Sequence, residues 1–312
     1  MVDCAIVGCG RIAGGYDVPH DDQIRTHAKA YLRNPDCQLV GVCDSDFNSA
    51  RRFSEIWGVD QVFTNVEDLL EKCKPDILSV CTPNEMHEPY FLKACKAGVP
   101  IVWMEKPAAS SLMEVERMIN LAKTTDTKVW VNYFRRYEKG FLNLSSALAS
   151  LGALQNVRAI YTKGLRNNGS HMLDLIDWFF GPIRNVGAVT PLHDPNFPSA
   201  SLTIEADRAS IELIALEYEQ FEIFELDIIG INGRITVVDG GQEIKYYQKG
   251  SARLYDEYSN LIFTHCHSGT YPTFMQEGLL RGLAGEVMPN LQNELKIQQV
   301  IQKISTKAQY QF

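Results

Sequence analysis

The sequence has no apolar run long enough to cross a membrane, no excess of basic residues and no CxxC motif. A transmembrane helix needs about 18 or more consecutive apolar residues, and a signal peptide needs a basic start, whereas this chain begins MVDCAIVGCG. We therefore expect neither a membrane span nor a secretory signal. The net charge of −8 is unsuited to a nucleic-acid backbone, so we expect no DNA or RNA partner. A single nucleotide is not excluded, because backbone N–H groups can hold its phosphates.

The eight cysteines show neither the spacing of a disulfide framework nor that of a zinc site. Cys4, Cys43 and Cys81 fall in apolar, strand-like runs, and Cys73 and Cys95 fall in helix-like ones. We expect reduced, mostly buried thiols of a cytoplasmic protein.

The chain is long enough for one large or two ordinary domains, and its 45% hydrophobic and 22% charged residues are typical of a globular protein. Over residues 1–131, short apolar runs such as CAIVG, QLVGVCD, DILSVC and PIVWM alternate with helical-period segments at residues 49–57, 66–72, 87–97 and 112–123. Strands spaced by helices predict parallel βαβ units, and therefore a doubly wound α/β sheet that is covered on both faces.

The pattern changes in the rest of the chain. Residues 132–312 contain longer runs with strand character, including an extended one at 209–231, and turn signals such as Asn232-Gly233. This pattern predicts a second, α+β domain with a mostly antiparallel sheet, closed by an amphipathic helix near residues 290–307.

A glycine-rich turn follows the first predicted strand. The residues Gly8-Cys9-Gly10-Arg11-Ile12-Ala13 fit the G-x-G-x-x-G/A pattern of dinucleotide-binding folds. Gly8 would make the tight turn, Gly10 would let the backbone approach a pyrophosphate, and a small residue at position 13 would let the helix pack on its strand. The phosphates would then meet the positive end of that helix. Methyltransferases also place a glycine-rich turn here, so the pattern alone leaves that class open.

Asp44 ends the second predicted strand, where a carboxylate accepts hydrogen bonds from the ribose hydroxyls of an adenosine. It lies 31 residues after Ala13 instead of the usual spacing of about 20. The surplus fits a loop inserted at residues 14–23, before a helix that contains His27. A carboxylate repels a 2′-phosphate, so Asp44 favours NAD over NADP. The alternative is that Asp44 merely ends a strand.

Two more polar segments follow predicted parallel strands. Cys81-Thr82-Pro83-Asn84, with His87 behind it, ends the fourth strand, and Glu105-Lys106-Pro107 ends the fifth. Doubly wound sheets bind ligands at these carboxyl ends. Taken by themselves, the two segments are equally consistent with a turn that caps a helix and with a solvated turn.

In order along the chain, GCGRIA, VCD, CTPNEMH, MEKP, VNYFRRY and GSHMLDLIDWFFG resemble the Gfo/Idh/MocA oxidoreductases, a family that includes glucose–fructose oxidoreductase and inositol dehydrogenase. The resemblance covers nearly the whole chain and is strongest over residues 3–181. It implies a Rossmann domain, a C-terminal domain with a large open sheet that often mediates oligomerisation, and hydride exchange between NAD(P) and a sugar or other polyol. Together, the glycine pattern and the resemblance assign these cofactor-binding residues: Gly8, Gly10, Arg11, Ile12, Asp44, Cys81, Thr82, Pro83, Asn84, His87, Glu105 and Lys106.

Oxidation of a secondary alcohol requires a hydride acceptor, a base for the hydroxyl proton and a positive group for the developing alkoxide. The resemblance implies that Lys106 is the positive group and His171 the base. His171 begins the segment HMLDLIDWFFG, which Ser170 or Asn168 would cap as a helix. Without the resemblance, a lone lysine is most often a solvated surface group and a lone histidine at a helix start is most often structural.

Many members of the family carry an aspartate four residues before this histidine, where the present chain has Asn167. An amide can orient a substrate but cannot stabilise an imidazolium by charge, and a helix N-terminus also disfavours that cation. We therefore predict a neutral His171, competent as a base near pH 7. We assign substrate binding to Asn167 and His171 together with Arg135. Arg135 and Arg136 would each bind a carboxylate or sugar phosphate, or form a surface ion pair.

Four further side chains have competing interpretations. His265 and His267 would face one side of an extended run, but no other ligand cluster lies near them in the sequence, so we expect contact with a substrate or a place on the surface and no metal site. Tyr271 and Phe274 would line a sugar pocket or pack in the core.

Three hypotheses about function follow. The leading one is an NAD-dependent dehydrogenase or reductase that acts on a hydroxyl of a sugar, cyclitol or nucleotide sugar, as a dimer or tetramer. The second is a non-catalytic dinucleotide sensor, which Asn167 favours and the pair Lys106 and His171 disfavours. The third, a methyltransferase, explains the glycine pattern but neither the Glu-Lys-Pro nor the His-x-x-Asp segment.

Overall fold

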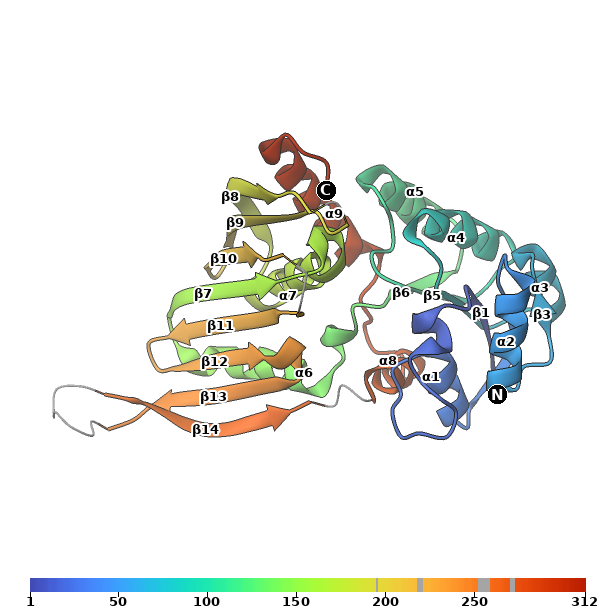
Figure 1. The fold of residues 1–312 in the computed structure, drawn as a ribbon, viewed down its shortest axis with the longest axis horizontal. Coiled ribbons are helices and arrows are strands. Elements are labelled where there is room, and N and C mark those ends of the chain that lie inside the picture. The colour runs from blue at the N-terminus through green and yellow to red at the C-terminus, as the bar shows by residue number, and fades with distance from the viewer. Residues whose placement is uncertain (195, 218–220, 252–258, 270–272) are drawn as a thin grey trace. The chain divides into compact units, whose positions relative to one another are not determined.

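Two compact units, each with its own sheet, make up the computed structural model, which describes residues 1–194, 196–217, 221–251, 259–269 and 273–312 (Figure 1). The first unit comprises Met1–Tyr137 and Tyr271–Lys296, and the second comprises Glu138–Thr270 and Ile297–Phe312. The chain therefore returns to its first unit near its end. The N–H of Val131 donates to the carbonyl of Pro289 at 2.7 Å, which ties the returning segment to the last strand of the first sheet.

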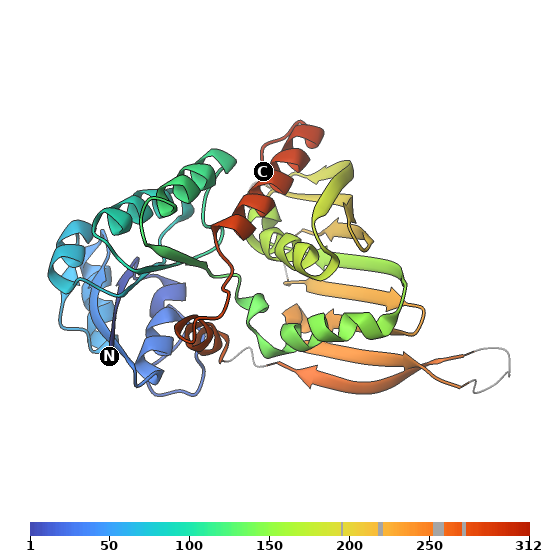
Figure 2. The same cartoon turned by 180° about the vertical axis from the view of Figure 1, so that it is seen from behind.

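The first unit is a parallel sheet with helices on both sides. Its strands are β1 (Val2–Val7), β2 (Cys37–Cys43), β3 (Val62–Phe63), β4 (Ile77–Val80), β5 (Ile101–Met104) and β6 (Lys128–Val131). Its helices are α1 (His27–Arg33), α2 (Phe47–Trp57), α3 (Val66–Cys73), α4 (His87–Lys96), α5 (Leu112–Ala122) and α8 (Phe274–Leu283). The strands pair in parallel in the order β3-β2-β1-β4-β5-β6. Helices α4 and α5 lie on one side and α1 and α8 on the other (Figures 1 and 2), which confirms the doubly wound α/β prediction.

Local sequence explains where these helices begin. The side chains of Thr26, Asp46, Asn65 and Ser111 each accept a backbone N–H from the first turn of the helix that follows. Such N-caps satisfy a donor that the helix itself leaves unpaired, and each is worth about 1 kcal/mol. The strands between the helices are almost entirely apolar because both faces of the sheet are covered; Trp103 in β5, for example, is fully buried.

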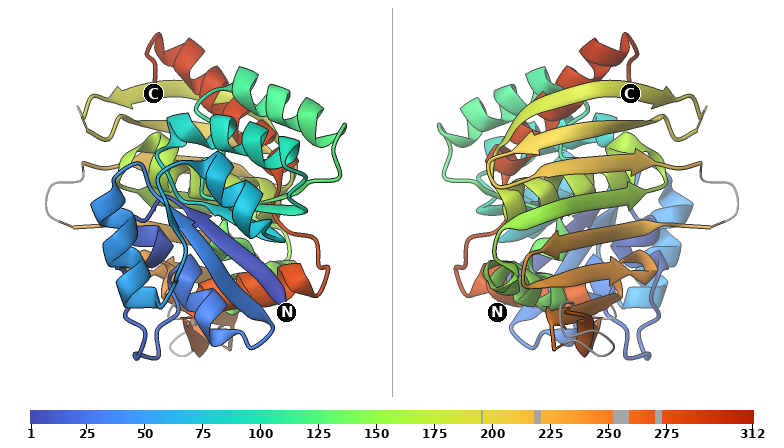
Figure 3. Two further views of the ribbon diagram at one scale, coloured as in Figure 1. Left: turned by 90° about the vertical axis from the view of Figure 1, so that its right-hand side faces the viewer. Right: turned by 90° about the vertical axis from the view of Figure 1, so that its left-hand side faces the viewer.

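The second unit is an open, mostly antiparallel sheet with helices over one face. Its strands are β7 (Leu154–Tyr161), β8 (Ile183–Leu192), β9 (Ser199–Ala206), β10 (Ser210–Ala215), β11 (Phe224–Gly230), β12 (Gly233–Val238), β13 (Glu243–Lys249) and β14 (Leu261–Ser268). Its helices are α6 (Lys139–Ala147), α7 (Ser170–Phe180) and most of α9 (Leu291–Ala308). The strand order is β14-β13-β12-β11-β7-β10-β9-β8. Figure 2 shows α6 and α7 over one face, and the right panel of Figure 3 shows the other face, over which no described helix of this unit lies.

The extended run at residues 209–231 was predicted as a single strand-like stretch, but it forms two strands. β10 pairs in parallel with one side of β7, and β11 pairs in antiparallel with its other side, so the chain must cross between them. The turns at Asn232-Gly233 and Asp239-Gly241 connect β11, β12 and β13 as predicted. Four elements have no clear sequence pattern: β8, β9, β14 and α8. In β8 two register shifts against β9 break the alternation of buried and exposed residues on which such a prediction depends.

None of the helices in the part of the chain that the structure describes is both long enough and apolar enough to cross a membrane.

Candidate functional site

The candidate cofactor residues come together at one edge of the first sheet. The strands β2, β1, β4 and β5 are adjacent and parallel, so the loops that follow them lie side by side at their carboxyl ends. These loops are the glycine-rich loop at residues 8–13 after β1, which we call the fingerprint loop, the turn at Asp44, the segment 81–87 and the Glu105-Lys106-Pro107 turn.

The two glycines of the fingerprint loop serve different purposes. Gly8 has φ +89°, and a Cβ added there would lie 2.7 Å from the backbone carbonyl of Cys81, so the fold itself requires glycine. A Cβ at Gly10 would meet nothing within 4 Å. Gly10 is exposed and is not needed for packing, which leaves room for a ligand to approach its backbone closely. These residues therefore fit a dinucleotide.

The helix after the fingerprint is much shorter than the pattern predicts. Arg11–Gly15 form a single π-type turn, and α1 begins only at His27. Only this one turn of aligned peptide dipoles stands where the pattern predicts a longer helix, and the contact of the phosphates with its positive end stays a prediction. The small residue that packing demands is Gly14 as well as Ala13, since a Cβ at Gly14 would lie 2.4 Å from the indole nitrogen of Trp57.

The insertion that separates this turn from α1 is held from inside by a buried carboxylate. Asp17 Oδ2 accepts the backbone N–H of Arg25 at 2.7 Å and the hydroxyl of Thr26 at 2.8 Å, and Oδ1 accepts Nε of Arg25 at 2.9 Å. On the other side, the buried ammonium of Lys29 donates to the carbonyls of Val18 and Pro19, both at 2.6 Å. The insertion predicted from spacing thus has a defined structure of its own.

Asp44 fastens the fingerprint loop to the end of β2. Its Oδ2 accepts the N–H of Cys9 at 2.8 Å, and its Oδ1 accepts the N–H of Asp46 at 3.0 Å. Each carboxylate oxygen retains a second lone pair, so these bonds leave acceptor capacity for two ribose hydroxyls. Asp44 therefore has a structural role, and this role is compatible with the predicted contact to ribose.

A cavity of about 540 Å³ opens beside the fingerprint. Its walls come from three segments, the π-type turn, the insertion and α2, and its lining includes Gly10, Arg11, Val18, Ser49, Arg52, Phe53 and Trp57. Arg52 was missed by sequence reasoning, which inferred the preference for NAD from Asp44 alone. The helical spacing of Ser49, Arg52, Phe53 and Ile56 was the available signal, because it places them on one face of α2.

The segment after β4 is joined to the Glu-Lys-Pro turn by His87. Its Nε2 lies 2.9 Å from the carbonyl of Thr82, and its Nδ1 lies 3.0 Å from the carbonyl of Pro107. The ring is fully buried, and burial lowers the pKa of His87. Both ring nitrogens face backbone carbonyls, so any effect of His87 on a cofactor would pass through the two loops that it connects. Within the segment after β4, Asn84–Met86 form a short 3₁₀ turn that leads into α4.

The Glu105-Lys106-Pro107 turn has one buried and one half-buried charged side chain. The carboxylate of Glu105 points into the unit, where its Oε1 accepts hydrogen bonds from Asn132 and lies 3.0 Å from Nε2 of His27. Lys106 is half-buried, and its peptide bond to Pro107 is cis. Of these two neighbouring charged side chains, the structure buries Glu105 and leaves Lys106 partly exposed.

Arg135 lies in a short 3₁₀ turn after β6 and is buried, not on the surface as the ion-pair alternative required. Its guanidinium carbon is 4.7 Å from the centre of the Phe134 ring, and that ring stacks on Phe274 at 4.2 Å. Phe274 thus packs in the core of the first unit, as the packing alternative predicted. Arg136 is half-buried, and Tyr271 lies outside the described residues.

In the second unit, His171 is buried within a longer helical segment than predicted. The residues Gly164–Gly169 form a π-type turn that runs directly into α7, and Gly169 already has helical φ and ψ. Neither Ser170 nor Asn168 therefore caps the helix; the hydroxyl of Ser170 donates to the carbonyl of Asn167 at 2.7 Å. His171 stands well inside this segment, so the argument from the helix N-terminus for a neutral ring is wrong, because that field fades within one turn. The neutral ring stays a prediction.

Asn167 is exposed, whereas Asn168 is buried and its amide donates to Glu222 at 3.1 Å. Helix α7 is buried on nearly every side, its polar residues Ser170, Asp174 and Asp177 included, and only Trp178 is not buried.

His265 and His267 lie two residues apart in β14 and face the same side of this strand, as predicted. The ring of His265 stacks on Tyr246 at 4.3 Å, and Nε2 of His267 lies 3.7 Å from Glu138 Oε1, where Gly140 leaves space for the ring. Among the described residues, no group of three or more histidine, cysteine or acidic side chains is arranged to hold a metal ion.

The cysteines are all free, and three of them lie near the fingerprint edge. Burial raises the pKa of Cys9, Cys43 and Cys81, for Cys43 to about 12. Such thiols stay protonated and unreactive near neutral pH.

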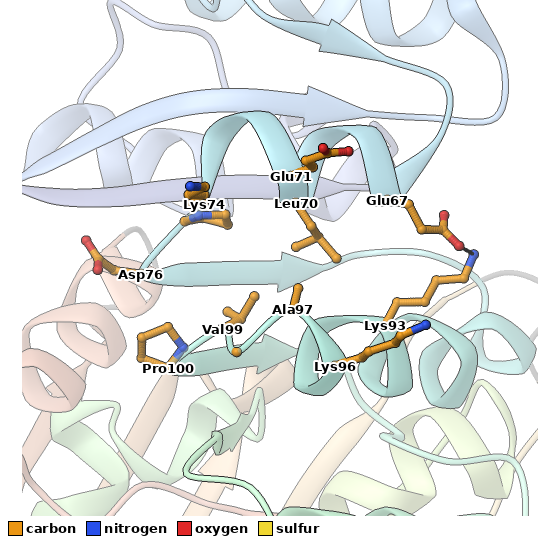
Figure 4. A pocket seen from close by; sticks show the side chains of 12 residues that line it. Glu67, Leu70, Glu71, Lys74, Asp76, Lys93, Lys96, Ala97, Val99 and Pro100 are labelled. Atoms are coloured by element: carbon orange, nitrogen blue, oxygen red, sulfur yellow. Dashed lines mark ion pairs between the residues drawn. The ribbon is translucent and has the colours of Figure 1, made fainter.

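A larger cavity, of about 620 Å³, lies away from this edge. Figure 4 shows it between α3 and α4, with Lys74 and Asp76 at one end and the Glu67–Lys93 ion pair at the other. Asp76 and Pro100 immediately precede β4 and β5, so this cavity lies at the amino ends of the strands. Its lining has three acidic and three basic side chains and therefore no preference for an anion.

Comparison with known proteins agrees with this geometry. Residues 2–133 match the family described as "Oxidoreductase family, NAD-binding Rossmann fold". The chain is 28% identical over 165 residues to D-glucoside 3-dehydrogenase of Escherichia coli and 26% identical over 143 residues to myo-inositol 2-dehydrogenase of Thermotoga maritima. These matches cover 53% and 46% of the chain but only 44% and 39% of those proteins, so the chain spans less than half the length of these two relatives.

The fold of the whole chain has solved counterparts. The WlbA dehydrogenase of Bordetella pertussis, solved with NADH and UDP-GlcNAcA, superposes with a TM-score of 0.76 at 19% identity over 99% of this chain and 96% of that one. At this identity the likeness concerns the two-domain fold. Residues 2–133 are thus similar to the Gfo/Idh/MocA oxidoreductases, a family described by its NAD-binding Rossmann fold.

Proposed function

We propose that this chain is an NAD(H)-dependent oxidoreductase that transfers a hydride between the nicotinamide and a secondary hydroxyl or keto group of a sugar, cyclitol or nucleotide sugar. The observation that carries the proposal is the edge of the first sheet, where a glycine loop with open space at Gly10 and the half-buried Lys106 both lie at the carboxyl ends of the strands. In this proposal residues 1–131 bind the dinucleotide, and residues 132–312 bind the substrate and mediate oligomerisation.

The cofactor assignment depends on the backbone of the fingerprint loop and on Asp44. Gly8, Gly10, Arg11 and Ile12 would hold the pyrophosphate, and the free lone pairs of Asp44 would accept the ribose hydroxyls. The segment Cys81-Thr82-Pro83-Asn84, joined through His87 to Glu105-Lys106, would border the nicotinamide end. When bound, the nicotinamide accepts or supplies the hydride. We expect NAD(H) to bind more tightly than NADP(H), because Asp44 repels a 2′-phosphate, although Arg11 and Arg52 in the adjoining cavity reduce that penalty.

Three residues would carry the chemistry of the chain itself. The ammonium of Lys106 would donate a hydrogen bond to the reacting oxygen and stabilise its developing negative charge. His171 would take the hydroxyl proton in oxidation and return it in reduction. Asn167, which is exposed one turn before His171, would orient the substrate through its amide. The buried guanidinium of Arg135 would bind an anionic group of the substrate.

The names of similar proteins support the substrate class. The two curated relatives are dehydrogenases of a glucoside and of an inositol, and the structural neighbour was solved with a nucleotide sugar. The presence of both Lys106 and His171 favours an enzyme over a non-catalytic dinucleotide sensor. A methyltransferase would need neither of them.

The open face of the second sheet supports a homo-oligomer. This face presents Ile160, Ile214 and Tyr247 among charged residues, and no described helix of the unit covers it. An uncovered sheet face with apolar side chains is typical of a subunit interface. We propose a dimer or tetramer in the cytoplasm, where the eight free thiols would remain reduced. Ile160→Glu would then lower the mass measured by analytical ultracentrifugation, and an unchanged mass would argue against this face.

The test of function is NADH fluorescence and its oxidation on mixing with a panel of sugars, cyclitols and sugar nucleotides. Turnover supports the enzyme, binding of NADH without any turnover supports the sensor, and no dinucleotide binding refutes both. His171→Ala should lower kcat by about 10² or more and leave the NADH affinity unchanged. His171→Phe, which fills the buried site, controls for loss of packing, and equal turnover in both variants and the wild type would reject the role of His171.

A further inference from the structure

A chain of buried polar side chains lies directly behind the Glu-Lys-Pro turn. The hydroxyl oxygens of Tyr31 and Ser79 are 2.6 Å apart, Ser79 Oγ is 2.8 Å from His27 Nδ1, and His27 Nε2 is 3.0 Å from Glu105 Oε1. Tyr31, Ser79 and His27 are at most 1% exposed. This arrangement connects α1 and β4 to the end of β5.

The same carboxylate oxygen is held from its other side by Asn132, which follows β6. Asn132 Nδ2 donates to Glu105 Oε1 at 2.5 Å, and the side-chain oxygen Oδ1 of Asn132 accepts the hydroxyl of Tyr137. Asn132 and Tyr137 are 1% and 2% exposed. The buried carboxylate of Glu105 therefore receives donors from two separate elements, each of which is itself anchored.

One assignment of protons satisfies every one of these atoms. Glu105 as a carboxylate accepts only, so Nε2 of His27 carries the proton and donates to it. Nδ1 of a neutral His27 then accepts the Ser79 hydroxyl, and Ser79 Oγ accepts the Tyr31 hydroxyl. The tautomer of His27, with its proton on Nε2, thus follows from the groups that its two ring nitrogens face. A buried carboxylate left without such donors would strongly destabilise the folded state.

The electrostatics around Glu105 favour its ionised form. Burial is the largest single influence and acts to raise the pKa of Glu105, but the interactions with His27, Asn132 and Lys106 outweigh it, and the pKa lies below its ordinary value. Within the described ranges, the titratable groups that interact electrostatically with Glu105 include His27, Cys81, His87, Lys106 and Tyr137.

We propose that His27 is a positioning residue for the hydride-transfer reaction: by holding the Glu105 carboxylate ionised and fixed, it sets the orientation and charge of the adjacent Lys106. This inference rests on the proposed function, since it concerns the lysine assigned to the reacting oxygen. Glu105 immediately precedes Lys106 in the chain, so a fixed Glu105 fixes the backbone from which the lysine side chain extends. Its negative charge also favours the ammonium form of Lys106.

Two substitutions at His27 and one matched control test this role. His27→Leu fills the space but removes both ring nitrogens, whereas His27→Gln retains an amide that can donate to Glu105. Tyr31→Phe removes one hydroxyl at the far end of the same chain and leaves the contact of His27 with Glu105 intact. Thermal unfolding establishes that each variant is folded before the other measurements are made.

Two readouts are taken on each variant. The first is the titration of the Glu105 carboxyl by ¹³C NMR of protein with labelled glutamate, assigned by its absence in Glu105→Gln. The second is the pH profile of kcat, with NADH affinity measured alongside. We expect His27→Leu to raise the pH at which Glu105 titrates, to lower kcat by about tenfold or more with the acid limb of its pH profile moved upward, and to leave NADH affinity nearly unchanged. His27→Gln should restore most of the Glu105 titration and most of kcat with its pH profile. Tyr31→Phe should resemble the wild type in every measurement.

The outcomes separate this inference from the proposed function. If the wild type turns over no substrate of the panel, the proposed function fails, and the Glu105 titration alone then decides whether His27 controls the carboxylate. If the wild type is active but His27→Leu leaves both the titration and the profile unchanged, the positioning role is refuted. A fall in kcat with the profile unchanged, and no rescue by His27→Gln, would mean that His27 is merely structural and would also overturn the inference.

Discussion

The two sheets place their polar candidate residues in different parts of their strands. In the parallel sheet both faces are covered, and the candidates lie in the loops at the carboxyl ends, where Gly10 and Lys106 border the proposed site. In the mostly antiparallel sheet, buried and partly exposed side chains alternate along strands such as β11. Polar side chains such as Arg234 and Asp227 therefore lie along the open face. A substitution in the first sheet can therefore affect binding or chemistry without touching the core, whereas one on the open face acts on the surface of its unit.

The largest expected effect is at the end of β5. Lys106→Ala should lower kcat by about 10² or more, because a positive group that stabilises a developing alkoxide acts mainly in the transition state. The NADH affinity should change by much less. Lys106→Arg, which keeps the charge but not the geometry, is the control, and turnover of Lys106→Ala at the wild-type rate would remove this lysine from the mechanism.

The fingerprint offers a matched pair of substitutions. Gly8→Ala forces a Cβ against the Cys81 carbonyl at a positive φ, so the free energy of unfolding should fall by about 2 kcal/mol or more. Gly10→Ala adds a Cβ in open space, so stability should stay within about 0.5 kcal/mol while NADH affinity falls by about tenfold. Urea unfolding and NADH fluorescence titration measure the two effects. Unchanged NADH affinity in Gly10→Ala would place the dinucleotide elsewhere.

Substitution of Asp44 should have a smaller effect than substitution of Lys106, and this effect combines structure with binding, because Asp44 both holds the fingerprint loop and is proposed to bind the ribose. Asp44→Ala removes acceptors for Cys9 and Asp46 as well as for the ribose, and NADH affinity should fall by about tenfold. Asp44→Asn keeps one acceptor oxygen and removes the charge, so the preference for NADH over NADPH should narrow. Equal NADH affinity in wild type and Asp44→Ala would reject the ribose contact.

The smallest effect is expected on the open face. Arg234 forms two parallel hydrogen bonds with Asp227, both at 2.8 Å, on partly exposed side chains. Arg234→Ala should therefore change the free energy of unfolding by only about 0.5 kcal/mol, less at high salt, with NADH binding unchanged. An effect several times larger, accompanied by a change in mass, would show that subunit contacts cover this ion pair.

Sequence reasoning succeeded best where pattern and packing agree. The run of apolar strands and amphipathic helices over the first 131 residues predicts the parallel sheet, because strands buried on both faces leave a continuous apolar pattern. The same pattern predicts that the loops with Gly8, Asp44, Thr82 and Lys106 lie at the carboxyl edge of this sheet, and the strand order confirms this placement of the loops. Sequence reasoning failed in β8, where register shifts hide the alternation, and at α8, which joins the first unit only after the chain has passed through the second.

The candidate site was predicted less completely than the fold. A motif identifies which residues stand in a loop but not which way each side chain points, so the inward carboxylate of Glu105 and the two carbonyl partners of His87 were not foreseen. Their partners come from other loops and from α1, at sequence separations that no local pattern reports. The interruption of the helix after the fingerprint was partly foreseen from the spacing to Asp44, but the single π-type turn was not.

The insertion between that turn and α1 also has a consequence for local stability. Lys29, buried within α1, donates to carbonyls of the insertion, and Asp17 in the insertion accepts from the residues that open the helix. Neither charge can be released to water unless both segments separate together. Amide hydrogen exchange should therefore report residues 17–33 as one cooperative opening unit, and a loop that looks removable in an alignment would, on deletion, unfold the helix that carries His27.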